Sequence, residues 1–473
     1  MPRLDREVRN RPRYRIHHDA PELAADPVGT GDLAANDELG GLAQGEGAYN
    51  ETADGAGAGP QRKTASGLIG ATVPNEIALT PAPGLAESAA RLGTESAFSV
   101  LARAKELERL GRSIVHLEIG EPDFPTPAHI AEAAIDAIRR GETHYTPSAG
   151  LKEFREAIAA DLADSRAIDV SPDRILVSNG AKPLLFFTIL AVCDPGDEIV
   201  YPDPGFPIYE SAIRWAGGVP VPLPLREELD FTFSLEDLSE RLGARTKLVI
   251  LNSPNNPTGA VIPAGVLRAA RDLILQTPAW VLSDEVYRRI AYDTEVVSIA
   301  SMPGMLERCV LLDGLSKTYA MTGWRCGYAA VPETLVEPLT RFIVNSVSCV
   351  PAFVQAAGVA ALTGPQETVA AMVEEFHARR DLVLSGLNAL PGVWSRVPQG
   401  AFYAFPDVSK VPLGAEELAD QLLEKAGVAL LAGVGFGACG ADHLRISYAN
   451  SRDRLEVALE RMEKFLRALD YEH

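Results

Sequence analysis

The feature that most constrains the fold is an alternation of short apolar runs and amphipathic runs between residues 174 and 314. The apolar runs are as long as β-strands and rich in Val, Ile and Leu, without strict alternation of apolar and polar residues. We expect strands at 174–180, 197–206, 218–225, 246–256, 280–287 and 308–314, and helices at 181–194, 234–243 and 263–276. Strands of this kind form a sheet that helices cover on both faces, as in an α/β domain.

More helices are expected on both sides of this region. Amphipathic periodicity predicts helices at 96–111, 126–141 and 150–165, and an apolar strand at 114–120. Beyond about Val350 the pattern changes to long helices, with short strands near 400–408 and 444–449. A chain of 473 residues is too long for one core, so we expect a second, smaller α+β domain after the large one.

The first 85 residues or so differ in composition from the rest. Arginines crowd between Arg3 and Arg15, and from Asp19 to Asp54 there are acidic residues but no lysine or arginine. Such a segment buries too little apolar surface to offset its ordering entropy, so we expect a disordered extension. Its start lacks the apolar core of a secretory signal. A targeting or docking arm, or a start codon assigned too far upstream, would also explain it.

Composition argues against several functional classes. Hydrophobic residues make up 47% and charged residues 23%, as in ordinary soluble globular proteins. The net charge of −20 argues against nucleic-acid binding. No apolar run reaches the roughly 18 residues that a membrane helix needs. The five cysteines lack the spacing of a metal site, so we expect no metal, free thiols and a reducing, cytoplasmic location.

Chemically suggestive side chains follow the ends of the expected strands, where open α/β sheets bind their ligands. Lys317 comes after the last apolar run, between the small residues Ser316 and Thr318. It is either a surface lysine or a lysine held neutral in a pocket, which can act as a Schiff-base nucleophile. Asp284 ends the preceding run and is either a helix cap or a buried partner for a ring N–H group. Tyr287 would lie on the same turn as this carboxylate.

A phosphate site is expected where the strand at 174–180 gives way to a helix. Gly180, Ala181 and Lys182 stand at this junction, and the N–H groups of a helix start bind phosphate well. An ordinary turn is the alternative. Arg325 would bind the same phosphate with two N–H groups or, as most lone arginines do, form a surface ion pair.

Two further residues suit a flat, oxygen-bearing ligand. Asn256 lies in a proline-rich and asparagine-rich loop that leaves a strand end, where it could donate to a phenolate oxygen. Phe206, also at a strand end, would stack on an aromatic ring or simply pack in the core. Together with the lysine, the acid and the phosphate site, these residues describe a pocket for pyridoxal phosphate held as a lysine imine.

Six sequence blocks occur in order between residue 118 and residue 451. They are EIGEPDFPTP (118–127), HYTPSAGLKEFREAIA (144–159), NSPNNPTGAV (252–261), LSDEVY (282–287), SKTYAMTGWRCGY (316–328) and LRISYANS (444–451). In these blocks the chain resembles the class I/II aminotransferases, fold-type-I pyridoxal-phosphate enzymes, and especially the bacterial aspartate/aromatic aminotransferase subgroup. The resemblance begins at about Glu95 and leaves the first 85 residues out.

The resemblance implies a fold-type-I architecture. Its large domain has a mostly parallel seven-stranded sheet between helices, and its smaller domain is of the α+β type. The expected divisions are the extension (1–85), an N-terminal segment that joins the small domain (86–128), the large cofactor-binding domain (129–345) and the C-terminal small domain (346–473).

The resemblance also implies a role for each matching residue. Lys317, Asp284 and Tyr287 would form the catalytic set, with Lys317 as the Schiff-base lysine and proton carrier and Asp284 as the pyridinium partner. The other implied cofactor contacts are Asn256 with Tyr287 (phenolate oxygen), Phe206 (ring stacking), Gly180, Ala181, Lys182, Ser316 and Arg325 (phosphate), and Tyr145 (phosphate of the neighbouring subunit in a homodimer). The implied substrate contacts are Arg445, which would bind the α-carboxylate, and Gly120 and Asn256.

The implied activity is transfer of an amino group from an L-amino acid to a 2-oxo acid by a ping-pong mechanism. Elimination or oxidation of an amino acid on the same scaffold is the alternative, and a requirement for a 2-oxo acid would distinguish them. A transcription regulator with an aminotransferase-like domain would need an N-terminal winged helix, and the acidic start has no helix-turn-helix pattern. A binding protein with an inactive site is disfavoured because Lys317, Asp284 and Arg445 are all present.

Two positions depart from the family pattern. Many relatives have a serine three residues before the lysine, whereas this chain has Gly314 there and Ser316 next to the lysine. The segment 344–355, VNSVSCVPAFVQ, is less polar than in aspartate-specific members and contains no lysine or arginine. With Phe206 and Phe353 as apolar surface, we therefore expect neutral rather than acidic amino donors.

Overall fold

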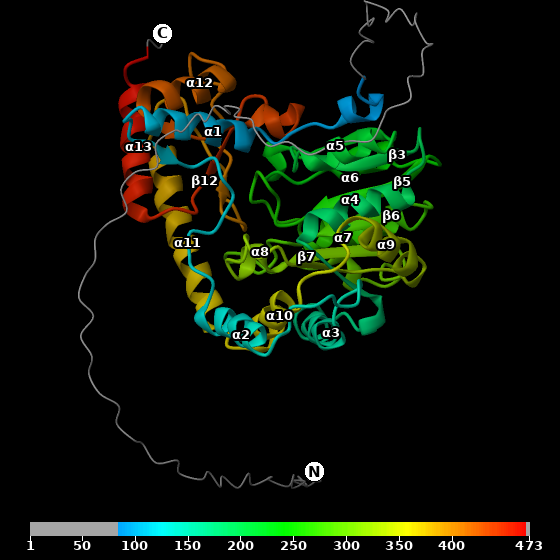
Figure 1. Ribbon diagram of the computed structural model, residues 1–473. Coiled ribbons are helices and arrows are strands. Elements are labelled where there is room, and N and C mark those ends of the chain that lie inside the picture. Colours follow the sequence, from blue (N-terminus) through cyan, green and yellow to red (C-terminus); the bar gives the residue numbers. More distant parts are fainter. Residues whose placement is uncertain (1–83, 470–473) are drawn as a thin grey trace, which may run out of the picture. The chain divides into compact units, whose positions relative to one another are not determined.

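The computed structural model describes residues 84–469, which contain a central seven-stranded sheet (Figure 1). The strands are β2 (Ile175–Ser178), β3 (Glu198–Asp203), β4 (Val219–Pro224), β5 (Thr246–Asn252), β6 (Trp280–Asp284), β7 (Cys309–Gly314) and β8 (Gly327–Ala330). Their order is β2-β8-β7-β6-β5-β3-β4. Within this sheet β8 runs antiparallel to β2 and β7, and the other pairs are parallel. The expected mostly parallel seven-stranded sheet is confirmed.

Alternate residues of the central strands pack into two different cores, because successive side chains of a strand point to opposite faces. Ile250 and Leu312 belong to the core on one face, together with α4 (Ala181–Val192), α5 (Ile208–Trp215) and α9 (Glu333–Ser346). Val249 and Leu311 belong to the core on the other face. The helices of that second face are α2 (Ala128–Arg139), α3 (Lys152–Arg166), α6 (Leu235–Arg241), α7 (Ala264–Ile274) and α10 (Ala352–Thr363). Helices thus cover both faces, as expected.

Segments from both ends of the described chain form the smaller sheets. β1 (Val115–His116) pairs in parallel with β10 (Val428–Ala429), while β12 (Leu444–Ser447) lies between β11 (Leu431–Ala432) and β9 (Tyr403–Ala404). The surrounding helices are α1 (Ser96–Arg109), α11 (Glu367–Leu387), α12 (Ala415–Gln421) and α13 (Arg452–Leu466). The N-terminal segment therefore contributes a strand to the C-terminal part, although the bounds of the domains stay a prediction.

Most expected elements are present, and the differences have simple causes. The strand expected at 114–120 is only two residues long, and helix α5 was not expected. Strand β8 was also missed in the residue pattern because its sequence, GYAA, has no β-branched residue. The expected disordered extension lies almost wholly in residues 1–83, outside the described part of the chain.

Three further observations concern only residues 84–469. None of their helices combines the length and the apolarity that crossing a bilayer requires. In the same range, no cluster of three or more His, Cys, Asp or Glu side chains is placed to hold a metal ion. All five cysteines lie within it and are free thiols.

Candidate active site

A cavity of about 370 Å³ opens at the carboxyl ends of the central strands. Its walls include the ends of β5, β6 and β7, the starts of α1 and α4, and strand β12. The residues named from the sequence that line it are Gly120, Ala181, Lys182, Phe206, Asn256, Asp284, Tyr287, Ser316, Lys317, Arg325 and Arg445. Gly180 borders this set through Arg325, whereas Tyr145 lies outside the cavity and is 92% exposed.

The register of the parallel strands explains why distant residues meet here. Asn252 of β5 pairs with Asp284 of β6, and Asp284 in turn pairs with Leu312 of β7. All three residues line the cavity. Because the strands are parallel and end together, the chain leaves each of them at the same edge of the sheet.

Lys317 lies on α8 (Leu315–Thr318), a single turn that follows β7 directly. Its Nζ donates a hydrogen bond of 2.6 Å to the backbone oxygen of Gly120. Burial, together with the nearby Arg445 and Arg325, lowers the pKa of Lys317 to about 8, against the opposing effect of Glu121. A substantial fraction of the amine is therefore neutral in weakly alkaline solution, as a nucleophile or general base requires.

Asp284 is buried at the end of β6 and has the opposite perturbation. Burial raises its pKa to about 6, even though a hydrogen bond from Tyr209 lowers it. The Tyr209 hydroxyl donates to Oδ2 at 2.7 Å, and the Val286 N–H lies 3.4 Å from Oδ1. A buried carboxylate of this kind gains from pairing with a ring N–H that carries positive charge.

The start of α4 offers backbone donors to an anion. Gly180 is its N-cap residue, with φ +92°, and no side chain caps the helix. There is no room for a Cβ here, since one on Gly180 would overlap the Arg325 guanidinium and one on Gly327 would overlap the backbone of Ala181. Uncapped N–H groups beside a guanidinium form an anion site.

Two side chains of the expected phosphate set behave differently. The guanidinium of Arg325 donates to the backbone oxygens of Thr322 and Asn179, at 2.9 Å and 3.3 Å, which orient it at the helix start. The ammonium of Lys182 instead forms an ion pair with Glu95 and lies 5.2 Å from the centre of the Phe206 ring. Lys182 can therefore serve an anion through its backbone N–H while its side chain is engaged elsewhere.

Arg445 lies on β12 and is buried against two aromatic rings. Its guanidinium is 4.7 Å from the ring centre of Tyr403 and 4.9 Å from that of Phe436. It donates to Asn256 Oδ1 at 3.3 Å and to the backbone oxygen of Glu118. Its Nε is buried and has no hydrogen-bond partner within residues 84–469. A buried donor of this kind is costly unless a ligand satisfies it, and a carboxylate would do so.

The sequence interpretation missed several cavity residues. Tyr209 supports Asp284, Tyr403 lies 2.8 Å from the Tyr287 hydroxyl, and Glu95 pairs with Lys182. Tyr209 had a usable signal, because it follows Phe206 by three residues at the start of a helix. Tyr403 and Glu95 had none, because their partners are far away in the sequence.

One residue used in the specificity argument lies elsewhere. Phe353 packs against the main hydrophobic core and does not line the cavity. The apolar surface of the cavity includes instead Leu185, Phe206, Leu431 and Phe436. For the cavity of its own chain, the expectation that Phe353 supplies apolar surface is therefore wrong, because its helix, α10, packs against the other face of the sheet.

Comparison with known proteins agrees with this geometry. Residues 112–462 match the family model for aminotransferase class I and II. A probable aspartate/prephenate aminotransferase from Aquifex aeolicus is 41% identical over 390 residues, which cover 81% of this chain and 98% of that protein. Aromatic-amino-acid aminotransferase 2 from Thermococcus litoralis is 39% identical over 358 residues, covering 75% of this chain and 92% of that protein.

A solved aminotransferase structure also matches this chain. The crystal structure of the aspartate aminotransferase from Rhizobium meliloti superposes with a TM-score of 0.79 at 37% identity, covering 82% of this chain and all of that chain. Members of this family use pyridoxal phosphate and act on amino acids and oxo acids. The chain belongs to the class I and II aminotransferase family, and it is an aminotransferase.

Proposed function

We propose that the cavity binds pyridoxal 5′-phosphate and that the enzyme moves an amino group from an L-amino acid to a 2-oxo acid. One observation carries this proposal. A lysine with a lowered pKa, a buried carboxylate with a raised pKa and an uncapped helix start line or border a single cavity. Groups whose pKa values are perturbed in opposite directions in one pocket are typical of acid–base catalysis.

The residues present fit this cofactor. The uncapped start of α4 and the Arg325 guanidinium suit its phosphate, and Asp284 suits its ring nitrogen. Phe206 lines the same cavity and offers a face for stacking, and Tyr287 and Asn256 offer donors for its phenolate oxygen. Ser316, also in the wall, would supply the hydroxyl that relatives place at the position of Gly314.

The bound cofactor would supply a carbonyl carbon that condenses with amines and a ring that withdraws electrons from the substrate Cα. Arg445 and Asn256 would hold the α-carboxylate of the amino acid, so that the Cα–H bond points to Lys317. The Nζ of Lys317 would take the Cα proton as general base and carry it to the acceptor carbon. Asp284 would remain ionised beside the ring nitrogen and so keep that nitrogen protonated.

Borohydride reduction followed by peptide mapping tests the site. We expect a stable adduct on Lys317, and we expect Lys317→Ala to lose both the adduct and nearly all transamination. Labelling of a different lysine would show that the assignment is wrong. A 2-oxo acid acceptor should be required for turnover. Product formation without one would favour elimination or oxidation instead.

We also propose a homodimer in which Tyr145 contacts the phosphate of the neighbouring subunit. The support is that Tyr145 is exposed and outside the cavity of its own chain, as a residue that serves another subunit would be. Mixing Lys317→Ala chains with Tyr145→Phe chains should restore part of the activity and cofactor affinity, because one pocket of the hybrid is intact. Mixing Lys317→Ala with Arg445→Ala should restore none. A fully active monomer in light scattering would contradict the proposal.

The amino donor is proposed to be neutral. Glu95 neutralises Lys182 at the cavity wall, and four apolar side chains, named above, line the same space. Apolar pockets discriminate weakly, so a broad range is expected. The rival is aspartate, which the names of several relatives print. Comparing kcat/KM for aspartate, glutamate, alanine, leucine, methionine, phenylalanine and tyrosine decides the question, and a clear lead for an acidic donor would refute the neutral pocket.

A cytoplasmic location is proposed on the five free thiols, two of which are fully buried. Fractionation of cells that express the chain at its natural level would test this, and recovery with a membrane or an organelle would contradict it.

A further inference from the structure

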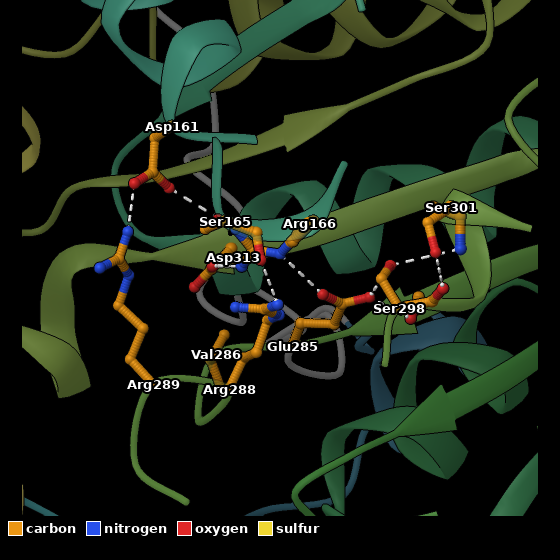
Figure 2. A network of polar contacts seen from close by, with 12 residues as sticks. Asp161, Ser165, Arg166, Glu285, Val286, Arg288, Arg289, Ser298, Ser301 and Asp313 are labelled. Carbon is orange, nitrogen blue, oxygen red and sulfur yellow. Dashed lines mark hydrogen bonds and ion pairs between the residues drawn. The ribbon is translucent and has the colours of Figure 1, made fainter. Parts of the chain in front are cut away.

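Figure 2 shows a cluster of charged side chains, of which Arg166, Glu285 and Asp313 are buried and the others are partly buried. Its members are Asp161 and Arg166 of α3, Glu285, Arg288 and Arg289 after β6, and Asp313 of β7. None of the six lines the cavity. The three positive and three negative side chains balance, yet burying charges is costly even when they are paired. Stability alone therefore does not explain why charged side chains occupy this part of the fold.

Strand geometry places this cluster on the face of the sheet opposite to the cavity. Asp284 and Leu312 line the cavity. Asp313 of β7 points the other way, because side chains alternate along a strand. Glu285, the residue after β6, lies on the same side as Asp313, because the Arg166 guanidinium binds both carboxylates. The Ser283 hydroxyl also donates to Glu285, at 2.9 Å, on this second face. Helix α3 covers the same face.

Arg166 is the centre of the cluster, and its side chain is completely buried. Its Nε donates to Glu285 Oε2 at 2.9 Å, and its Nη2 donates to Asp313 Oδ2. Its Nη1 lies 3.6 Å from Asp161 Oδ2. Burial lowers the pKa of Arg166, but the carboxylates of Asp313 and Glu285 outweigh this effect and raise it, so the side chain stays charged.

Each carboxylate that Arg166 binds is tied to a candidate catalytic element. Glu285 directly follows Asp284, and its N–H donates to the Leu312 oxygen of β7 at 2.9 Å. Asp313 Oδ1 accepts the N–H of Gly314 at 2.6 Å, and Gly314 is the N-cap residue of the turn that carries Lys317. One planar guanidinium therefore bridges the ends of two neighbouring strands.

The remaining bonds leave the two carboxylates little freedom. Glu285 Oε1 accepts from Ser298 at 2.5 Å as well as from Ser283, and Asp313 Oδ2 lies 3.3 Å from the Tyr328 hydroxyl. With Arg166 in place, both orientations are fixed by directional contacts. Apolar side chains would fill this space but would give the ends of the two strands no such directional contacts.

We propose that Arg166 is a positioning residue of the transamination reaction, which sets the placement of Asp284 relative to Lys317 by binding Glu285 and Asp313 from behind the sheet. This inference rests on the proposed roles of Asp284 and Lys317. A displacement of about 1 Å between reacting groups can lower a rate on the order of a hundredfold. A lysine keeps the charge but cannot hold two carboxylates in a fixed planar fork.

The test compares Arg166→Lys with Arg289→Lys in the holoenzyme. Arg289 belongs to the same cluster, but among residues 84–469 its one ion pair is with Asp161, so it controls for the weakening of a partly buried ion pair. We expect Arg166→Lys to lower kcat by roughly ten- to a hundredfold with little change in the KM of the amino donor. Arg289→Lys should keep kcat within about threefold of the wild type.

A second readout needs no activity. In the cofactor-free protein, competitive acylation reports the pKa of Lys317, and we expect this pKa to rise in Arg166→Lys and to stay unchanged in Arg289→Lys. Equal losses of melting temperature in the two variants, with kcat and the Lys317 pKa also equal, would overturn the proposal and leave a purely structural cluster.

Two controls keep the result interpretable. If Arg166→Lys does not fold, the triple variant Arg166→Met with Glu285→Gln and Asp313→Asn replaces it, since it also removes the charges of the two carboxylates that Arg166 binds, and wild-type kcat in that variant would overturn the proposal. Borohydride labelling of the wild type comes first. Labelling at a lysine other than Lys317 would refute the proposed function itself, whereas labelling at Lys317 with unaffected Arg166 variants would refute only the positioning role.

Discussion

Replacing Lys317 by methionine should stabilise the protein when no cofactor is bound. In the folded chain, burial, together with Arg445 and Arg325, lowers the pKa of Lys317 to about 8. In the unfolded chain the amine keeps its ordinary pKa of 10.5. The unfolded state therefore binds the lysine proton more tightly, and the charged lysine destabilises the fold below pH 8. Methionine has a similar shape and no charge to bury.

The magnitude follows from the difference between the two pKa values. The pKa of Lys317 falls from its ordinary value of 10.5 to about 8 in the folded chain. At 1.36 kcal/mol per pH unit, this difference corresponds to about 3 kcal/mol. Water reaches the partly buried Lys317 through the cavity, and methionine loses the hydrogen bond to Gly120, so we expect a gain of roughly 1–2 kcal/mol near pH 7. This gain is constant below pH 8 and shrinks towards pH 10.5, because there the folded lysine is already neutral.

Urea denaturation of the cofactor-free proteins at about pH 7 and about pH 10 measures the gain, at equal protein concentrations. Lys152→Met is the matched control, because Lys152 is exposed on α3 and lies 3.6 Å from Glu156. The control should show the same small effect at both pH values. A gain for Lys317→Met that is absent near pH 7, or that does not shrink at pH 10, would refute the reasoning.

Three further predictions concern the cavity. Tyr209→Phe removes a hydrogen bond that lowers the pKa of Asp284, so in the cofactor-free protein NMR of this carboxyl should show titration at a higher pH than in the wild type; an unchanged titration would contradict the assigned bond. Arg445→Lys should cost roughly 2–4 kcal/mol of transition-state binding, measured as a drop of about 30- to 900-fold in kcat/KM, and a smaller loss would argue against a bidentate carboxylate contact. Glu95→Gln frees the ammonium of Lys182, so kcat/KM for glutamate should rise by roughly fivefold relative to that for leucine, and an unchanged ratio would show that the ion pair does not set donor charge.

The positions of the strand-end residues could be predicted because they depend on local signals. Asp284 and Lys317 each follow a short apolar run, and parallel strands bring the residues that follow them to one edge. Gly180 could be placed because a glycine at the junction of a strand and a helix marks a turn with positive φ. The position of a residue could therefore be predicted where it depends only on one strand and the residues that follow that strand.

The missed residues depend on contacts between distant parts of the chain. Glu95 meets Lys182 only because the start of α1 lies at the wall of the cavity, and Tyr403 meets Tyr287 only because strand β9 lies beside the segment that follows β6. Nothing in the local sequence marks these pairs. Strand β8 was missed for another reason. Close packing favours small residues in this strand, since a Cβ at Gly327 would overlap the backbone of Ala181.

The same alternation that defines the sheet explains why its end can be both reactive and rigid. On one face of β6 and β7, Asp284 and the turn with Lys317 open into a cavity, where side chains have fewer packing contacts to hold them. On the other face the next residue of each strand is bonded to Arg166. Apolar side chains there would give equal or greater stability, since a buried ion cluster gains little over well-packed hydrophobic residues. Apolar side chains would not fix the positions of the two strand ends, however, because dispersion contacts are non-directional. Charge-assisted hydrogen bonds require a specific geometry and therefore hold the strand ends in place. If Asp284 and Lys317 have the roles proposed above, the hydrogen bonds on the far face of the sheet keep the reacting groups in position at the open cavity.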